Sequence, residues 1–407
     1  MVKAAILGIG TVGGGTAEVL TKNRELIARR AGQEIELKYI LCRKARPDHP
    51  FAHLIVHDID TIVNDPEIGV VAECIGGATL AYEYDRRCLE AGKNVVTSNK
   101  ELVAEKGLEL TALARRKGVN FMFEASVGGG IPILRPICQC LAANEISSVC
   151  GILNGTTNYI LTEMIQCGKS FAQALREAQQ KGYAEADPTA DVEGIDAGRK
   201  ICILADLCFG KNVPPSSITT EGITNITPAD IECARILGYK IKLLGRAMRT
   251  GPNSVSAFVA PHLISKSNPL ANVDGVTNGI SVKGDAVGEA MFFGPGAGAH
   301  PTASAVTGDM IDCVRDPSTR TYMGWWPSEP GYVTGPEKLS CKWMVRVVAP
   351  LSQIGAAFQG VRFIPAPNAE PDEYAFVTPY MPGEELTART KGMDVRARYR
   401  VLDWGIY

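Results

Sequence analysis

The chain has 407 residues, 45% of them apolar, and a formal net charge of −2. Its length exceeds what one compact core usually fills, so two or three domains are expected. The balanced charge argues against a nucleic-acid-binding protein, which normally carries a basic excess. No apolar run approaches the roughly 20 residues that cross a bilayer, so no membrane partner is expected.

The twelve cysteines are scattered along the chain and include no C-x-x-C pair. This spacing supports neither a disulfide framework nor a zinc site. We therefore expect reduced thiols and a cytoplasmic protein.

Short apolar strands alternate with helical patterns in the first third of the chain. The strands are expected at residues 2–7, 35–42, 70–75, 94–97 and 120–124. This alternation is typical of a parallel sheet with helical crossovers. Residues 1–130 are therefore predicted to form an α/β domain.

The first expected strand leads directly into a G-x-G-x-x-G motif. Gly8 allows a tight turn, Gly10 lets the backbone approach a pyrophosphate, and Gly13 lets helix and strand pack closely. The helix then begins at Thr11 and Val12, where backbone N–H groups can bind the phosphates. This context predicts a Rossmann-type dinucleotide-binding domain. A glycine-rich turn without a ligand is the alternative.

The end of the second expected strand indicates which nicotinamide cofactor is preferred. An NAD site usually has Asp or Glu there for the ribose hydroxyls, whereas this chain has Arg43 and Lys44. These cations would attract the 2′-phosphate of NADP, and arginine can bind it in fork geometry. The pattern favours NADP(H), with NAD(H) as the other candidate. Ordinary solvated charges are the alternative interpretation.

The middle of the chain changes pattern. Strand-like and helical stretches are expected at residues 145–153, 159–167, 171–181, 195–210, 254–259 and 279–283. We expect an α+β substrate-binding and dimerisation domain at 131–295. Residues 316–337, rich in Pro, Gly, Ser and Thr, are interpreted as a linker.

The last part of the chain, 338–407, has its own strand and helix pattern. Strands are expected at 343–348, 361–364, 374–378 and 395–401, with helices at 351–359 and 384–391. This order predicts a small ferredoxin-like C-terminal unit with short helices.

Five carboxylates lie within twelve residues of the middle domain: Glu185, Asp187, Asp191, Glu193 and Asp196. Such a cluster repels itself unless cations or solvent are near, and a solvated surface run is the simplest interpretation. Asp196 and Lys200 would share one helix face. The apolar residues that follow place this pair at the start of a buried helix, where a charged pair is more often functional.

Four further segments resemble the signatures of one enzyme family. They are G-K-N-V-V-T-S-N-K at 92–100, E-A-S-V-G-G-G-I-P at 124–132, G-I-L-N-G-T-T-N-Y at 151–159, and G-Y-A-E-A-D-P at 182–188, which continues to Lys200. Over about residues 1–315 the chain resembles homoserine dehydrogenases. The third and fourth segments are the specific ones, because many dehydrogenases share the glycine fingerprint.

The resemblance implies a reaction and its catalytic residues. Family members interconvert L-homoserine and L-aspartate 4-semialdehyde with a nicotinamide cofactor, a step toward threonine and methionine. Lys200 would donate or accept the proton at the substrate oxygen, and Asp196 would position the substrate or the lysine. Lys100 would lie near the nicotinamide and the substrate. Hydride would pass between the nicotinamide and the aldehyde carbon.

The resemblance also implies the binding residues. Glu185 would bind the substrate ammonium, with Asp191, Thr156 and Tyr183 as further substrate contacts. A helix at about 296–315 would return to the dinucleotide-binding domain. Besides the fingerprint, Arg43 and Lys44, the expected cofactor contacts are Gly76, Thr97, Lys100, Gly182, Gly296 and Gly298.

Residues 124–131 have a second implied role. The resemblance implies a monovalent cation, Na⁺ or K⁺, held by Glu124 and by the backbone carbonyls of Val127, Gly129 and Ile131. Hard oxygen ligands of this kind suit such ions. A glycine-rich hinge between domains is the alternative.

The C-terminal unit resembles a degenerate ACT domain, which in longer relatives often senses an amino acid. Residues 349–352 lack the glycine expected at its ligand-binding turn. A structural or dimer-forming role is therefore favoured over threonine feedback, and a homodimer or higher homo-oligomer is expected.

Two other functions stay open. The chain could be a related semialdehyde or amino-acid reductase of the same two-domain build. It could also be an NADP-sensing regulator without turnover, although such a sensor has no need of Lys100, Glu185, Asp196 and Lys200.

Overall fold

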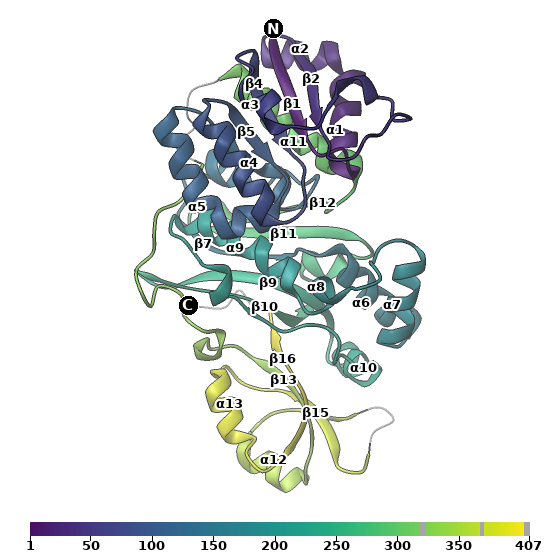
Figure 1. Cartoon of the computed structure of the whole chain (residues 1–407). Coiled ribbons are helices and arrows are strands. Elements are labelled where there is room, and N and C mark those ends of the chain that lie inside the picture. Colours follow the sequence, from purple (N-terminus) through teal and green to yellow (C-terminus); the bar gives the residue numbers. More distant parts are fainter. Residues whose placement is uncertain (317–322, 367–369, 403–407) are drawn as a thin grey trace. The chain divides into compact units, whose positions relative to one another are not determined.

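The computed structural model of the chain describes residues 1–316, 323–366 and 370–402 and divides into two compact units (Figure 1). The first comprises Met1–Ile146, Cys202–Pro215 and Lys283–Ser328, and the second comprises Ser147–Ile201, Ser216–Val282 and Glu329–Tyr407. The predicted domain boundaries, at residues 130, 295 and 337, separate expected functions and not compact units, so they stay a prediction. The predicted linker includes residues 317–322, which lie outside the described residues.

A six-stranded parallel sheet forms the centre of the first unit. Its strands follow the order β3-β2-β1-β4-β5-β6. Their bounds are β1 Val2–Leu7, β2 Ile35–Leu41, β3 Ile55–Val56, β4 Ile68–Glu73, β5 Asn94–Thr97 and β6 Phe121–Met122. This order is that of the Rossmann fold, which confirms the predicted fold. The two-residue β3 was not predicted.

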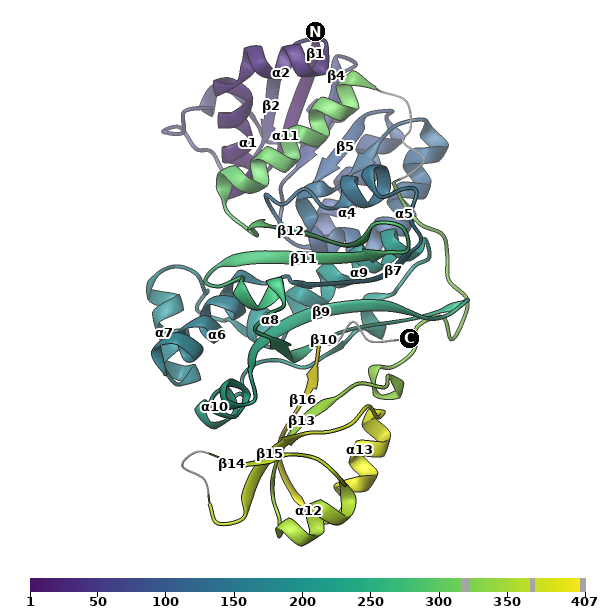
Figure 2. The same cartoon turned by 180° about the vertical axis from the view of Figure 1, so that it is seen from behind.

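Helices cover both faces of this sheet. They are α1 Thr11–Lys22, α2 Arg24–Ala31, α3 Ile59–Val63, α4 Ala78–Glu90, α5 Lys100–Lys117 and α11 Ala299–Arg315. Figures 1 and 2 show α4 and α5 on one face and α1 and α11 on the other. Because both faces are covered, Ala4, Ala5, Ile6 and Leu7 of β1 are all fully buried. The helix α11, which lies where the return helix was predicted, contacts α1 and the strands β4 and β5. The unit also contains β12 (Gly288–Pro295).

The second unit combines a largely antiparallel sheet with helices. Its helices are α6 Gly155–Cys167, α7 Phe171–Gln180, α8 Thr189–Val192, α10 Pro228–Ile236 and the start of α9 Ile195–Phe209. Its first strands are β7 Ile146–Ile152, β8 Thr219–Thr220, β9 Tyr239–Gly251, β10 Ser254–Ser265 and β11 Thr277–Gly284. A long hairpin of β9 and β10 pairs Tyr239 with Ser265 at one end and Gly251 with Ser254 at the other.

The C-terminal part of this unit has the predicted β-α-β-β-α-β order. Its elements are β13 Trp343–Val348, α12 Leu351–Ala357, β14 Phe363–Pro365, β15 Glu373–Val377, α13 Gly383–Arg389 and β16 Asp394–Val401. The sheet continues in the order β11-β7-β9-β10-β16-β13-β15-β14, with β8 on β10. The last four strands have the ferredoxin-like arrangement. Their core includes Trp343, Phe358 and Phe376. Identity with an ACT domain stays a prediction.

Among the residues that the structure describes, no helix has both the length and the apolar character needed to cross a membrane.

Candidate functional site

The glycine fingerprint lies between β1 and α1, where two of its glycines are required by close approach. Gly8 has φ +98°, and a Cβ atom there would lie 2.9 Å from the Cys74 carbonyl oxygen. A Cβ at Gly13 would lie only 2.0 Å from the Gly8 carbonyl oxygen. Gly10 is the N-cap of α1, so the helix opens with Thr11 and Val12. Side chains at Gly8 and Gly13 would collide with the backbone of this turn, whereas a Cβ at Gly10 would meet nothing within 4 Å. The open space at Gly10 and the start of α1 fit a pyrophosphate.

A cavity of about 330 Å³ lies beside this turn. Arg43, Lys44 and Arg46 line it after the end of β2, and Tyr84 and Leu80 of α4 line it as well. The remaining lining residues are Gly8, Leu41, Cys42 and Ile75. These described residues supply three cations and no carboxylate, so the cavity suits an anionic group. Arg46 was not predicted, although it is only three residues from Arg43.

The other predicted cofactor contacts of the first unit lie at the ends of neighbouring strands. Gly76 is in the turn between β4 and α4, and Thr97 is the buried last residue of β5. Lys100 is the first residue of α5, and the Asn99 side chain caps that helix by accepting a hydrogen bond from the Leu102 amide. Since β4 and β5 pair in parallel, these residues share one sheet edge.

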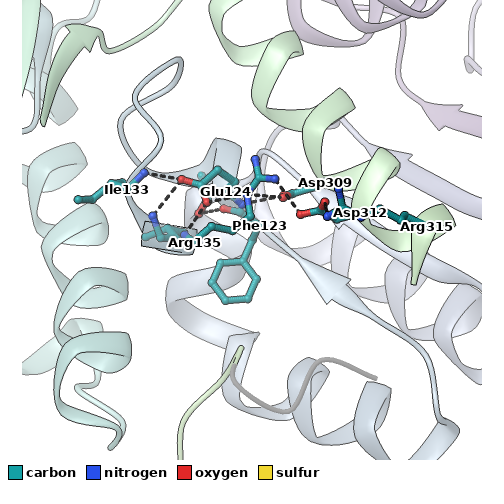
Figure 3. Close-up of polar contacts among 9 residues, drawn as sticks. Phe123, Glu124, Ile133, Arg135, Asp309, Asp312 and Arg315 are labelled. Atoms are coloured by element: carbon teal, nitrogen blue, oxygen red, sulfur yellow. Dashed lines mark hydrogen bonds and ion pairs between the residues drawn. The ribbon is translucent and has the colours of Figure 1, made fainter. Parts of the chain in front are cut away.

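The Glu124 side chain closes the glycine-rich loop on itself (Figure 3). One carboxylate oxygen accepts hydrogen bonds from the Ile133 and Leu134 amides at 2.6 and 2.9 Å. The other accepts from the Arg135 amide at 2.7 Å and from its Nε at 3.4 Å. The carboxylate is 1% exposed and fully engaged within the loop. Its predicted role as a cation ligand therefore receives no support from this geometry.

Two acids of α11 fix the same loop from the other side. Asp309 accepts a hydrogen bond from the Glu124 amide at 2.8 Å, and Asp312 accepts one from Arg135 Nη1 at 2.8 Å (Figure 3). Burial, opposed by the charge of Arg135 and reinforced by Glu124, raises the pKa of Asp309 to about 8. No group of three or more His, Cys, Asp or Glu side chains that could hold a metal occurs in the described part of the chain.

The loop also approaches the segment before α11. A Cβ at Gly129 would lie 2.5 Å from the Gly296 carbonyl oxygen, and the Gly130 amide donates to the Pro295 carbonyl at 3.0 Å. Gly298 caps α11 with φ +125°. The predicted cation ligands Val127 and Ile131 lie in this loop and are buried. The structure thus brings Gly296 next to Gly129 of the loop at 124–131.

In the second unit, the predicted catalytic pair is formed and buried. The Lys200 ammonium donates hydrogen bonds to Asp196 and to the Leu153 carbonyl oxygen, both at 2.7 Å. Asn154 Nδ2 donates to Asp196 at 2.9 Å and to Asp191 at 2.6 Å. Lys200 is 8% exposed and Asp196 is 5% exposed. A lysine held in this way by a carboxylate and a carbonyl can exchange a proton with a substrate oxygen.

Asn154 was missed as a site residue, although it lies in the third family segment. It caps α6 through its side-chain oxygen, which accepts a hydrogen bond from the Thr157 amide. A strand followed by Asn at a helix N-cap could have indicated it. The contact of the Leu153 carbonyl oxygen with Lys200 could not be predicted from the sequence, because it is made by the backbone and not by a side chain.

The remaining predicted substrate residues surround the turn after α7. Thr156 Oγ1 donates a hydrogen bond to the Tyr183 carbonyl oxygen at 2.6 Å. The Tyr183 ring packs edge-on against the Tyr159 ring, with the two ring centroids 5.1 Å apart. Gly182 lies in this turn with φ +75°, a left-handed conformation that favours glycine. Glu185 is exposed just beyond it.

The acidic run is divided by the fold. Asp191 and Asp196 both accept hydrogen bonds from Asn154, whereas Asp187 is exposed and accepts two from Thr189, which lower its pKa. Glu193 accepts a hydrogen bond from the Thr224 hydroxyl. The fold therefore brings Asp191 and Asp196 together at Asn154 and leaves Asp187 exposed to solvent.

Two models of known protein families match this chain. The family model described as "Homoserine dehydrogenase" matches residues 132–311, and "Homoserine dehydrogenase, NAD binding domain" matches 8–124. The homoserine dehydrogenase of Pseudomonas aeruginosa is 50% identical over 324 residues, or 78% of this chain and 74% of that protein. That of Bacillus subtilis is 40% identical over 319 residues, or 77% and 73%.

Solved structures extend the similarity to the whole chain. A homoserine dehydrogenase from Thiobacillus denitrificans gives a TM-score of 0.90 at 37% identity and covers 99% of both chains. A hyperthermophilic archaeal homoserine dehydrogenase, solved in complex with NADPH, gives 0.67 at 27% identity and covers 78% of this chain and 99% of its own. With the fingerprint, the buried lysine–aspartate pair and these relatives together, the chain belongs to the homoserine dehydrogenase family.

Proposed function

We propose that the chain interconverts L-homoserine and L-aspartate 4-semialdehyde. The observation that carries this proposal is the buried Lys200, held between Asp196 and the Leu153 carbonyl oxygen. In the direction of reduction, the bound dihydronicotinamide supplies a hydride to the aldehyde carbon. Lys200 gives a proton to the carbonyl oxygen as that hydride arrives, and takes the proton back in the reverse direction.

The surrounding residues hold the amino-acid end of the substrate and the lysine. Asp196 keeps the Lys200 side chain oriented, and Asn154 joins Asp196 to Asp191. Glu185 is exposed two residues after Tyr183 and would bind the substrate ammonium, with Thr156 and Tyr183 shaping the turn before it. Lys100 serves the nicotinamide end from α5 of the first unit.

An absorbance assay in the NADPH band tests the function directly. Purified chain should oxidise NADPH with aspartate 4-semialdehyde and reduce NADP with homoserine. Turnover of a different semialdehyde alone would favour the related-reductase alternative. Tight NADPH binding without either reaction would support the alternative of an NADP-sensing regulator.

We further propose that NADP(H) is preferred over NAD(H). The cavity beside the fingerprint supports this, because Arg43, Lys44 and Arg46 line it and can bind a 2′-phosphate. The archaeal relative solved with NADPH is consistent with such a site. Equal kcat/KM for the two cofactors would contradict the preference.

A monovalent cation, Na⁺ or K⁺, is proposed for the loop at 127–131. Its ligands would be the carbonyl oxygens of Val127, Gly129 and Ile131, which are hard donors, while Glu124 shapes the loop. Positive φ angles at Gly128 and Gly129 turn the backbone there. Activity in Na⁺ or K⁺ should exceed activity in N-methylglucamine at equal ionic strength.

We propose a cytoplasmic homo-oligomer whose C-terminal unit is structural. Free thiols at all twelve cysteines suit a reducing compartment. The parallel pairing of β16 with β10 makes the C-terminal strands part of the larger sheet of the second unit. Light scattering should give a dimer or larger species, and a threonine titration should leave activity unchanged.

A further inference from the structure

Glu73, the last residue of β4, has a fully buried side chain that joins two loops. One carboxylate oxygen accepts a hydrogen bond from the Ile75 amide, and the other accepts one from the Thr97 hydroxyl at 2.5 Å. The Ser98 amide donates to the Glu73 carbonyl oxygen at 3.3 Å. One acidic residue therefore ties the turn after β4 to the end of β5.

The hydrogen bonds continue from Thr97 to the start of α5. The Thr97 hydroxyl oxygen accepts a hydrogen bond from the Asn99 amide at 2.9 Å. The Asn99 side chain donates to the carbonyl oxygens of Ile75 and Gly77 at 3.1 and 2.8 Å, and its own oxygen accepts from the Leu102 amide. The chain of contacts thus encloses Gly76 on one side and reaches the helix turn that begins with Lys100 on the other.

A second buried acid lies next to Glu73. Asp85 of α4 is fully buried, and within the described residues neither of its carboxyl oxygens has a hydrogen-bond partner. Burial and then the charge of Glu73 hold the pKa of Asp85 well above its usual value. Burial also raises the pKa of Glu73 to about 7, although Thr97, Ile75 and Asn99 oppose the shift through hydrogen bonds. Burying an acid costs stability unless hydrogen bonds compensate for its lost solvation.

We propose that Glu73 is a positioning residue for hydride transfer, acting through Thr97 and Asn99 on the two loops that carry Gly76 and Lys100. The inference rests on the proposed function, which puts Lys100 at the nicotinamide end of that reaction, and on Gly76 as an expected cofactor contact. Glu73 touches neither substrate nor cofactor. It fixes the distance between two loops that approach the reacting atoms from neighbouring strands, and displacements near 1 Å can cost about 100-fold in rate.

The test uses the full-length chain with Glu73→Gln, which keeps the volume but removes one of the two acceptors. We expect kcat to fall by about 10- to 100-fold, KM for NADPH to rise, and the kinetic isotope effect with NADPH deuterated at the transferred position to increase. The melting temperature should stay level or rise, because a buried acid is removed. A purely structural role would instead lower activity only together with stability.

Thr97→Val removes the relaying hydroxyl and should reproduce these changes, whereas Thr97→Ser should restore most of the activity. The double variant Glu73→Gln/Thr97→Val should lose no more than either single variant, since both break one path. Glu83→Gln on the exposed side of α4 is the matched control and should behave as the native chain. If Glu73→Gln does not fold, Glu73→Asp, whose shorter side chain draws the two acceptors away from Ile75 and Thr97, is measured in its place and should show the same changes in kcat, KM and isotope effect.

The outcomes separate this inference from the proposed function. A native chain without turnover of either substrate overturns the proposed function, and the inference falls with it. An active native chain whose Glu73→Gln variant keeps native kcat, KM and isotope effect overturns the inference alone. Additive losses in the double variant would also contradict it, since Glu73 would then not act through Thr97.

Discussion

Lys200 owes its position to two segments that are far apart in the chain. It lies four residues after Asp196 on α9, while the Leu153 carbonyl oxygen comes from the junction of β7 and α6, 47 residues earlier. The i,i+4 spacing made the ion pair predictable from the sequence. The carbonyl was not predictable, because every residue has one and only the fold selects it.

Lys200→Ala should lower kcat by about 10²- to 10⁴-fold, the usual contribution of a positioned proton donor. NADPH affinity, measured by fluorescence titration, should remain native because the fingerprint is untouched. Lys266→Ala, an exposed lysine of the same unit, is the control. A Lys200→Ala variant with native turnover would remove this lysine from the mechanism.

Arg43 and Lys44 line the cavity beside the fingerprint, and the proposed preference for NADP(H) depends on them. Arg43→Ala/Lys44→Ala should lower kcat/KM for NADPH by about 10²- to 10⁴-fold, since charge-assisted hydrogen bonds contribute roughly 1.5–3 kcal/mol each. Values for NADH should change little, and added salt should narrow the difference. Arg29→Ala on α2 serves as control. Parallel losses for both cofactors would contradict a 2′-phosphate site.

At the scale of elements, two glycines of one motif have separable roles. A Cβ at Gly13 would meet the Gly8 carbonyl, whereas a Cβ at Gly10 would meet nothing within 4 Å. Gly13→Ala should therefore lower the free energy of unfolding by about 1–3 kcal/mol, as overpacking does. Gly10→Ala should keep native stability but lose NADPH affinity, because its methyl group would occupy the space of the pyrophosphate.

Urea unfolding and NADPH titration of both variants check this pair of expectations. Equal stability losses in the two variants would show that Gly10 also has a packing role.

The strand β10 carries a buried histidine at its junction with β16. His262 is opposite Lys242 of β9 and Arg400 of β16. Burial and then the charges of Arg246 and Arg400 hold the pKa of His262 well below its usual value. The folded chain therefore keeps this ring neutral, whereas the unfolded chain binds a proton below about pH 6.5.

Stability should accordingly be lost as pH falls below about 6.5, at up to about 1.36 kcal/mol per pH unit from this group. His262→Phe should shrink the difference between the urea midpoints at pH 7 and pH 5. His53→Phe, an exposed histidine, should leave that difference native. An unchanged difference in His262→Phe would show that other groups govern the acid response.

Strands were predictable from the sequence where burial requires a continuous run of apolar residues, as in β1 and β4. β9 was missed because Lys240, Lys242 and Arg246 interrupt that pattern. Lys242 is nevertheless fully buried, since Asp274 and Asn158 satisfy its ammonium. Partners so distant in the chain leave no local signal.

For the molecule as a whole, fold class and family followed from the sequence, but the compact units did not. The first unit is assembled from three separate segments, Met1–Ile146, Cys202–Pro215 and Lys283–Ser328. Hydrophobic periodicity tells which residues are buried and not which segment buries them. Only the family resemblance indicated that a helix near 296–315 returns to the dinucleotide-binding domain.

The late position of α11 in the chain has a consequence for protein synthesis. Its buried residues Ala303, Val306 and Met310 face a sheet whose strands leave the ribosome well over a hundred residues earlier. Until residue 315 has emerged, that apolar surface is exposed and the nascent chain is open to proteases and chaperones. Stalled nascent chains ending at residue 146 should therefore be digested rapidly, and resistance of the first unit should appear only in chains that include α11.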